Sequence, residues 1–132
     1  RKVEQILNKK IRNKIITFLG VTFKPNTDDM REASSIPMMN FLSKKNCKIK
    51  YFDPSGKKRE IDKIKNVEFC KNIPLACLKS DLIIIHTEWN VFKLLNFKKL
   101  VKKKKFSIFD MRNIYSPSKM KQMKIKYFGI GR

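Results

Sequence analysis

Residues 15–37 constrain the fold more than any other part of the chain. Ile15 to Leu19 is a short apolar run rich in β-branched and aromatic side chains, which is typical of a buried strand. The run breaks at Gly20, and the loop that follows is dense in charged, amide and hydroxyl groups. Ser34 or Ser35 then offers a helix cap, with Pro37 inside the first turn. This order of strand, polar loop and helix start predicts one unit of an open α/β sheet.

The rest of the chain repeats this alternation. Residues 81–87 contain the most apolar run, Leu82 to Ile85, as expected for a central parallel strand covered on both faces. Shorter apolar runs predict strands at 48–52, 67–69, 106–109 and 126–129, and helices are expected at 36–46, 73–78, within 57–67 and over 90–103. The pattern predicts a Rossmann-like, doubly wound α/β fold with a mostly parallel sheet and helices on both faces.

Residues 1–13 precede this alternating region. Val3, Ile6, Leu7 and Ile11 fall on one helical face, with charged residues on the other. The spacing predicts a single amphipathic helix over 1–13, which leads into a domain over 14–132. The chain opens on Arg1 and not on Met, so we expect it to be a piece of a longer protein.

Three polar loops should meet at one edge of the predicted sheet, because each follows the carboxyl end of a strand. They are Phe23 to Arg31, Thr87 to Trp89, and Asp110 to Asn113. Lys24, Arg31 and Arg112 would there be anion ligands, and Phe23 or Trp89 could offer an aromatic surface to a base. Together with the helix start, these side chains predict a nucleotide-phosphate site.

The signature of a dinucleotide site is missing. A single glycine, Gly20, directly follows the first predicted strand, so the loop after it has no GxGxxG. Asp53 ends the second strand, where an acidic residue would hold a ribose, but it lies 33 residues after Gly20, whereas the motif places it about 20 residues on. We therefore expect Rossmann-like order without an independent NAD site.

The charge of the chain allows two readings. Lys and Arg number 32 against 11 Asp and Glu, a formal net charge of +21 that would attract polyanions in a salt-dependent way. The excess is almost entirely lysine, accompanied by many Ile and Asn residues, as AT-rich codons favour. Nucleic-acid sites usually interleave Arg and exposed aromatics, whereas here the lysines look scattered, apart from Lys102 to Lys105. Compositional drift is the preferred reading, which argues against a nucleic-acid partner.

The cysteines and the single histidine limit which metal sites and disulfides the chain can form. Cys47, Cys70 and Cys77 have no CxxC spacing and are odd in number, which argues against zinc and against disulfides and fits a cytoplasmic protein. His86 is the only histidine, so no histidine cluster can hold a metal. No run of 18 apolar residues is present, so we expect no membrane span.

The polar loops also carry a resemblance. Residues 20–33, Gly-Val-Thr-Phe-Lys-Pro-Asn-Thr-Asp-Asp-Met-Arg-Glu-Ala, are similar to the opening of the C-terminal UDP-binding domain of the UDP-glucose/GDP-mannose dehydrogenase family, and most of all to its UDP-glucose 6-dehydrogenases. Four further family motifs follow in order: 51–53 with Pro54, 87–89, 109–115 and 130–132. Met111 stands where the family commonly has Gly. The similarity runs from about residue 14 to the end of the chain.

The resemblance implies roles for particular residues. Phe23, Lys24 and Arg112 would contact the UDP-sugar, and Arg31 would approach an NAD held mainly by an absent N-terminal domain. The family oxidises C6 of UDP-glucose to a carboxylate in two NAD-dependent steps, with a catalytic cysteine in a glycine-rich motif upstream of this domain. None of the three cysteines here lies in such a motif, so we expect this chain alone to have no catalytic residue and to be inactive. Residues 1–13 would be the end of a central linker helix that helps form a homodimer.

The sequence leaves alternatives open. The same domain of a UDP-N-acetylhexosamine or GDP-mannose dehydrogenase would share most of these residues. A basic nucleic-acid-binding module would show affinity that falls steeply with salt, and a structural domain that supports a dimer would bind no ligand.

Overall fold

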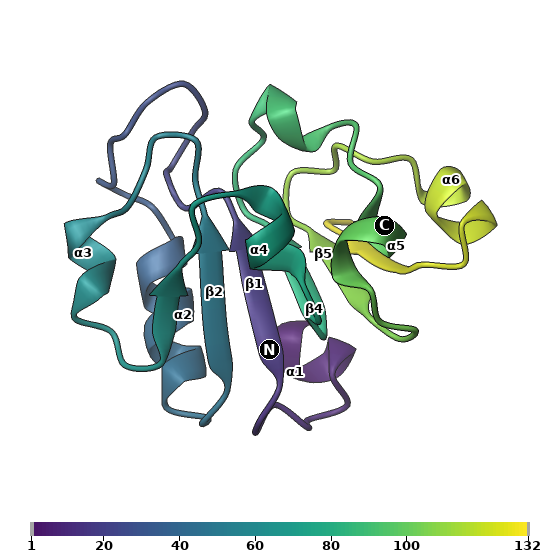
Figure 1. Ribbon diagram of the computed structural model, residues 1–132, viewed down its shortest axis with the longest axis horizontal. Helices are drawn as coiled ribbons and strands as arrows, with labels where there is room; N and C mark the ends of the chain where they lie inside the picture. The colour runs from purple at the N-terminus through teal and green to yellow at the C-terminus, as the bar shows by residue number, and fades with distance from the viewer. Residues whose placement is uncertain (1, 132) are drawn as a thin grey trace.

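A six-stranded, fully parallel sheet forms the centre of the computed structural model, which describes residues 2–131 (Figure 1). The strand order is β3-β2-β1-β4-β5-β6, so the chain winds outward from β1 in one direction and then from β4 in the other. The strands are β1 Ile15–Leu19, β2 Lys48–Phe52, β3 Val67–Phe69, β4 Leu82–Ile85, β5 Ser107–Asp110 and β6 Lys126–Gly129. This order is that of a doubly wound Rossmann-like fold.

Helices cover both faces of the sheet. They are α1 Lys2–Ile6, α2 Ser35–Ser43, α3 Arg59–Asp62, α4 Ile73–Cys77, the 3-10 helix η1 Asn90–Phe92, α5 Phe97–Val101 and α6 Pro117–Gln122. Helices α1, α2 and α3 pack on one face with Ile16, Phe18 and Ile84. Helices α4, α5 and α6 pack on the other face, in front of the sheet in Figure 1, with Leu19, Ile83 and Ile85. Strand β4 contributes to both cores, because successive side chains point to opposite faces.

The predicted strands are confirmed to within a residue or two at their ends. The single helix over 1–13 is wrong: α1 ends at Ile6, and Asn8 and Lys9 take positive φ angles of 54° and 61°, which a helix cannot contain. Helix α6 was not predicted, although Ser116 followed by Pro117 is a regular helix start, in which the Ser116 side chain accepts a hydrogen bond from Lys119 N–H. No helix among residues 2–131 is long and apolar enough to cross a membrane.

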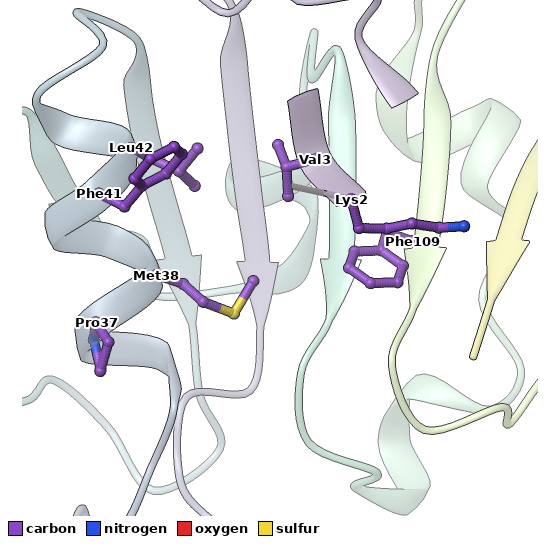
Figure 2. A pocket seen from close by; sticks show the side chains of 7 residues that line it. All are labelled: Lys2, Val3, Pro37, Met38, Phe41, Leu42 and Phe109. Carbon is purple, nitrogen blue, oxygen red and sulfur yellow. The ribbon is translucent and has the colours of Figure 1, made fainter. Parts of the chain in front are cut away.

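An apolar hollow lies between α1 and α2 above the sheet (Figure 2). It has a volume of about 270 Å³ and is lined by Lys2, Val3, Pro37, Met38, Phe41, Leu42 and Phe109. Apart from Lys2, these side chains have no charged or hydrogen-bonding group that could bind a phosphate. This hollow is therefore poorly suited to a phosphate-bearing ligand.

Lys50 is a buried cation inside the sheet. It lies in the middle of β2 with 8% of its surface exposed, and its Nζ donates to the carbonyls of Leu75 and Leu78, each at 2.9 Å. These carbonyls belong to the last turn and the C-cap of α4, where the helix leaves acceptors unsatisfied. The ammonium therefore attaches α4 to β2.

Replacement of this cation tests its structural role. Lys50→Met keeps the length of the side chain but leaves two acceptors unpaired, so we expect the free energy of unfolding to fall by about 1–3 kcal/mol. Lys48→Met on the same strand is the matched control, because Lys48 is exposed and pairs with Glu68 only at 3.9 Å. Urea unfolding of both variants measures the difference, and equal stabilities would contradict the role assigned to Lys50.

Candidate functional site

The site begins where β1 and β4, neighbours at the centre of the sheet, end side by side. Gly20 follows β1 with a φ of +81°, and a Cβ built there would lie 2.6 Å from the Cβ of Thr87. The strand order reverses between these two parallel strands, and open α/β sheets bind ligands in the crevice at this point. Glycine is required at position 20 by both the backbone angle and the close approach.

Asp53 fixes the start of the loop after β1. Its side chain is buried, with Oδ2 accepting from Val21 N at 2.8 Å and Oδ1 accepting from the N–H of Ser55 at 2.9 Å. On the same loop, Ser35 Oγ at the start of α2 donates to the Val21 carbonyl at 2.6 Å. Both carboxylate oxygens of Asp53 are thus engaged by backbone donors.

His86 connects three parts of the site. Thr87 Oγ1 donates to the Thr22 carbonyl at 2.6 Å, so it must accept the contact from His86 Nδ1 at 3.2 Å. The proton of the neutral ring therefore sits on Nδ1, and Nε2 accepts from Ser34 Oγ at 2.9 Å. Ser34 occupies the N-cap position of α2 but makes no side-chain cap bond, because its hydroxyl is used here. The network links α2, the end of β4 and the loop after β1.

Arg112 closes the site from the loop after β5. Its Nε donates to the His86 carbonyl at 2.8 Å and its Nη2 donates to the Phe23 carbonyl at 2.9 Å. Glu88 Oε1 lies 3.8 Å from Nε and gives the guanidinium a counter-charge. Asp110 Oδ1 accepts from the backbone N–H of Arg112 at 3.1 Å and holds the loop. Both Nη1 protons and one Nη2 proton of Arg112 remain for a ligand.

A polar hollow of about 320 Å³ lies beside Phe23, lined by Phe23, Lys24, Thr27, Asp29, Arg31 and Glu32. Within it, Arg31 Nε and Nη2 donate to both oxygens of Asp29 at 2.8–3.1 Å. The hydrogen bonds from the Arg31 side chain and backbone lower the pKa of Asp29 to about 2, and Lys24 adds a smaller effect of its charge. The hollow thus contains two cations, Lys24 and Arg31, and two acidic side chains, Asp29 and Glu32, of which Asp29 stays ionised at neutral pH.

The structure brings the predicted anion ligands to one edge. Phe23, Lys24 and Arg31 share the hollow, and Arg112 bonds the backbone of Phe23 from the neighbouring loop. Of the two aromatic candidates, Phe23 is 48% exposed, while Trp89 packs against the core under α4 and α5. His86 and Ser34 were not predicted as site residues, since a lone histidine after an apolar strand carries no motif of its own.

None of the three cysteines lines the hollow beside Phe23. Cys47, Cys70 and Cys77 are buried and free. Burial raises the pKa of Cys47 to about 11 and that of Cys77 to about 12, and it also raises the pKa of Cys70. They are protonated at neutral pH and are poor nucleophiles.

The buried histidine makes a testable contribution to pH dependence. Burial, and secondly the charge of Arg112, lower the pKa of His86 from 6.5 to about 4. The unfolded chain therefore binds a proton below pH 6.5 that the folded chain does not, and stability is lost as the pH falls from 6.5 toward 4. We expect His86 to account for about 2 kcal/mol of lost stability between pH 7.5 and pH 5.

Urea unfolding of the wild type and of His86→Gln at both pH values isolates this contribution, since all other groups titrate in both proteins. Because the chain has one histidine, its single imidazole NMR signal also reports the pKa directly. A titration near 6.5, or an equal pH effect in the variant, would contradict the assigned environment.

Comparison with known proteins agrees with this geometry. The pattern of the UDP-glucose/GDP-mannose dehydrogenase family, UDP binding domain, matches residues 17–117. UDP-glucose 6-dehydrogenases from Rhizobium meliloti and Rickettsia felis are each 34% identical, over 100% and 98% of this chain, which spans 30% of each relative.

Solved structures share the fold. One titled as an NDP-N-acetyl-D-galactosaminuronic acid dehydrogenase from Methanosarcina mazei has a TM-score of 0.82 at 24% identity, over 99% of this chain and 27% of that one. A UDP-glucose dehydrogenase from Pyrobaculum islandicum has a TM-score of 0.76 at 22% identity, over 97% of this chain and 27% of that one. The sheet order, the residues at its carboxyl edge and these matches together show that the chain belongs to the UDP-binding domains of the UDP-glucose/GDP-mannose dehydrogenase family.

Proposed function

We propose that the carboxyl edge of the sheet binds the UDP part of UDP-glucose, within a longer NAD-dependent enzyme that oxidises UDP-glucose to UDP-glucuronate. The observation that carries the proposal is the convergence of Lys24 and Arg112 on the exposed ring and the backbone of Phe23, at the end of the central strands. The choice of UDP-glucose over a UDP-N-acetylhexosamine or GDP-mannose rests on the 34% identical relatives, all of whose names are UDP-glucose 6-dehydrogenase.

Each side chain has a distinct role in this proposal. Arg112 is already held by two carbonyls, so its remaining donors are preorganised for a phosphate oxygen or a uracil carbonyl. Lys24 is exposed, and its flexible four-carbon stem can carry a point charge to the pyrophosphate. Phe23, with its ring half exposed, offers a surface on which the sugar or the base can pack.

The oxidation itself requires parts outside this chain. NAD would supply the hydride acceptor, and the residues after β1 do not fit it: Thr87 fills the space at Gly20, and Asp53 is engaged by Val21 and Ser55. Arg31 is 88% exposed in its side chain and could reach an NAD held by another domain if it exchanged Asp29 for a phosphate. The protonated thiols leave the nucleophile to another part of the enzyme, which we expect to work as a homodimer in the cytoplasm.

Titration calorimetry with UDP tests the proposal. We expect saturable binding that prefers UDP to AMP and persists at raised salt. Removal of one charge-assisted contact in Lys24→Ala or Arg112→Ala should weaken UDP by about 10- to 100-fold, which corresponds to about 1.5–3 kcal/mol. Lys93→Ala, an exposed lysine outside the hollow, is the matched control and should leave the affinity unchanged.

Arg112→Lys separates charge from geometry. A lysine keeps the charge but cannot bond two carbonyls and a ligand together, so we expect it to bind UDP nearly as weakly as Arg112→Ala. Equal affinity for AMP and UDP, or equal loss in the Lys93→Ala control, would overturn the assignment of a UDP site.

A further inference from the structure

Positive charge is enriched at the amino edge of the sheet, the edge opposite the proposed UDP site. The three residues that precede each of the six strands contain eight basic side chains and one acidic side chain, Asp81. The three residues that follow each of β1 to β5 contain two basic side chains, Lys71 and Arg112, and two acidic ones, Asp53 and Glu88. Both sets consist of residues that flank strands, so the lysine-rich composition of the chain alone would give the two edges similar net charges.

Every strand has at least one lysine in this set, namely Lys14, Lys45, Lys65, Lys79, Lys105 and Lys124. Because neighbouring strands lie about 4.8 Å apart, the row extends for about 24 Å along the edge. The nearest acid, Asp81, is already occupied, with Oδ2 accepting from Ile15 N at 2.8 Å and Oδ1 bonded to Lys103. The edge thus presents a line of positive charge with little local compensation.

Four of the six lysines are available to a partner. The other two are already engaged. Lys45 Nζ lies 4.0 Å from Glu4 Oε2 and over the ring of Phe41, and Lys79 Nζ donates to the Lys102 carbonyl. The four available lysines make no side-chain hydrogen bond or ion pair among residues 2–131; they are Lys14, Lys65, Lys105 and Lys124.

Amide side chains lie among these lysines. Asn13, Asn46 and Asn66 precede β1, β2 and β3 with φ angles of 59–65°, which turn the chain from a helix or loop into each strand. Together with Lys48 and Glu68 they line a hollow of about 640 Å³ between these turns. Lysine and asparagine are residues that contact the phosphates and sugars of nucleic acids without reading their bases.

We propose that this amino edge binds the phosphate backbone of a nucleic acid without sequence specificity. A linear polyanion fits a row of lysines one strand apart. An anionic membrane fits less well, because the exposed large apolar side chains near this edge are only Leu78 and Met123 among residues 2–131, each 38% exposed. The lysines look scattered in the sequence because the fold, and not their spacing along the chain, aligns them.

Fluorescence anisotropy with a short labelled DNA duplex of arbitrary sequence tests this proposal. Contacts from about four lysines predict saturable binding that weakens about 100-fold between about 50 and about 200 mM KCl. The double variant Lys65→Glu/Lys105→Glu should weaken binding about tenfold or more and make the affinity less dependent on salt. Lys71→Glu/Lys93→Glu makes the same change in net charge away from the amino edge and should lose far less.

Several outcomes would overturn the proposal. Equal losses in the two double variants would show that net charge alone attracts the duplex. Displacement of the duplex by excess UDP would locate it at the carboxyl edge. Binding to phosphatidylserine vesicles without binding to DNA would identify a membrane surface, and the absence of saturable DNA binding would leave the edge without this function. Because UDP and DNA are predicted at opposite edges, either one can fail while the other holds.

Discussion

The close approach of Gly20 to Thr87 is the constraint on which the site depends. With no Cβ at position 20, the loop after β1 passes within van der Waals distance of the end of β4, and Thr87 Oγ1 reaches the carbonyl of Thr22. This bond leaves Thr87 as an acceptor and so sets the tautomer of His86, whose Nε2 then receives Ser34 at the start of α2. A side chain at position 20 would separate the two strand ends and break this series of contacts.

Arg112 depends on the same arrangement. Its two carbonyl acceptors, His86 and Phe23, belong to the two loops that Gly20 allows to meet. A guanidinium held in this way loses little further conformational freedom when it binds a ligand, whereas Lys24 remains free to follow the ligand's charge. The site therefore combines one rigid cation with one mobile cation. The carboxylate of Asp53 holds the loop after β1, and that of Asp110 holds the loop after β5.

Local patterns predicted the strands because parallel strands buried on both faces need continuous apolar runs, and Leu82–Ile85 is one. The same reasoning failed for residues 1–13. There the apolar spacing fitted a helix throughout, but Ile11 is buried in the sheet core after a turn at Asn8 and Lys9 and not along a continued helix. Amphipathic spacing reports which side chains are buried, and tertiary packing decides whether the backbone between them stays helical.

The sequence by itself determined the family and the parallel α/β fold. It also determined that the loops carrying Phe23, Lys24, Arg31 and Arg112 lie at one edge, because they follow strands whose carboxyl ends must share that edge. Only the tertiary structure decided that Arg112 is held by the His86 carbonyl, since the two residues are distant in sequence. It also decided that the Arg31 guanidinium donates to the Asp29 carboxylate, and that His86 is neutral because it is buried. It also decided the distribution of charge. One lysine before each strand lies at the same edge, because the parallel sheet places the starts of all its strands on the same side.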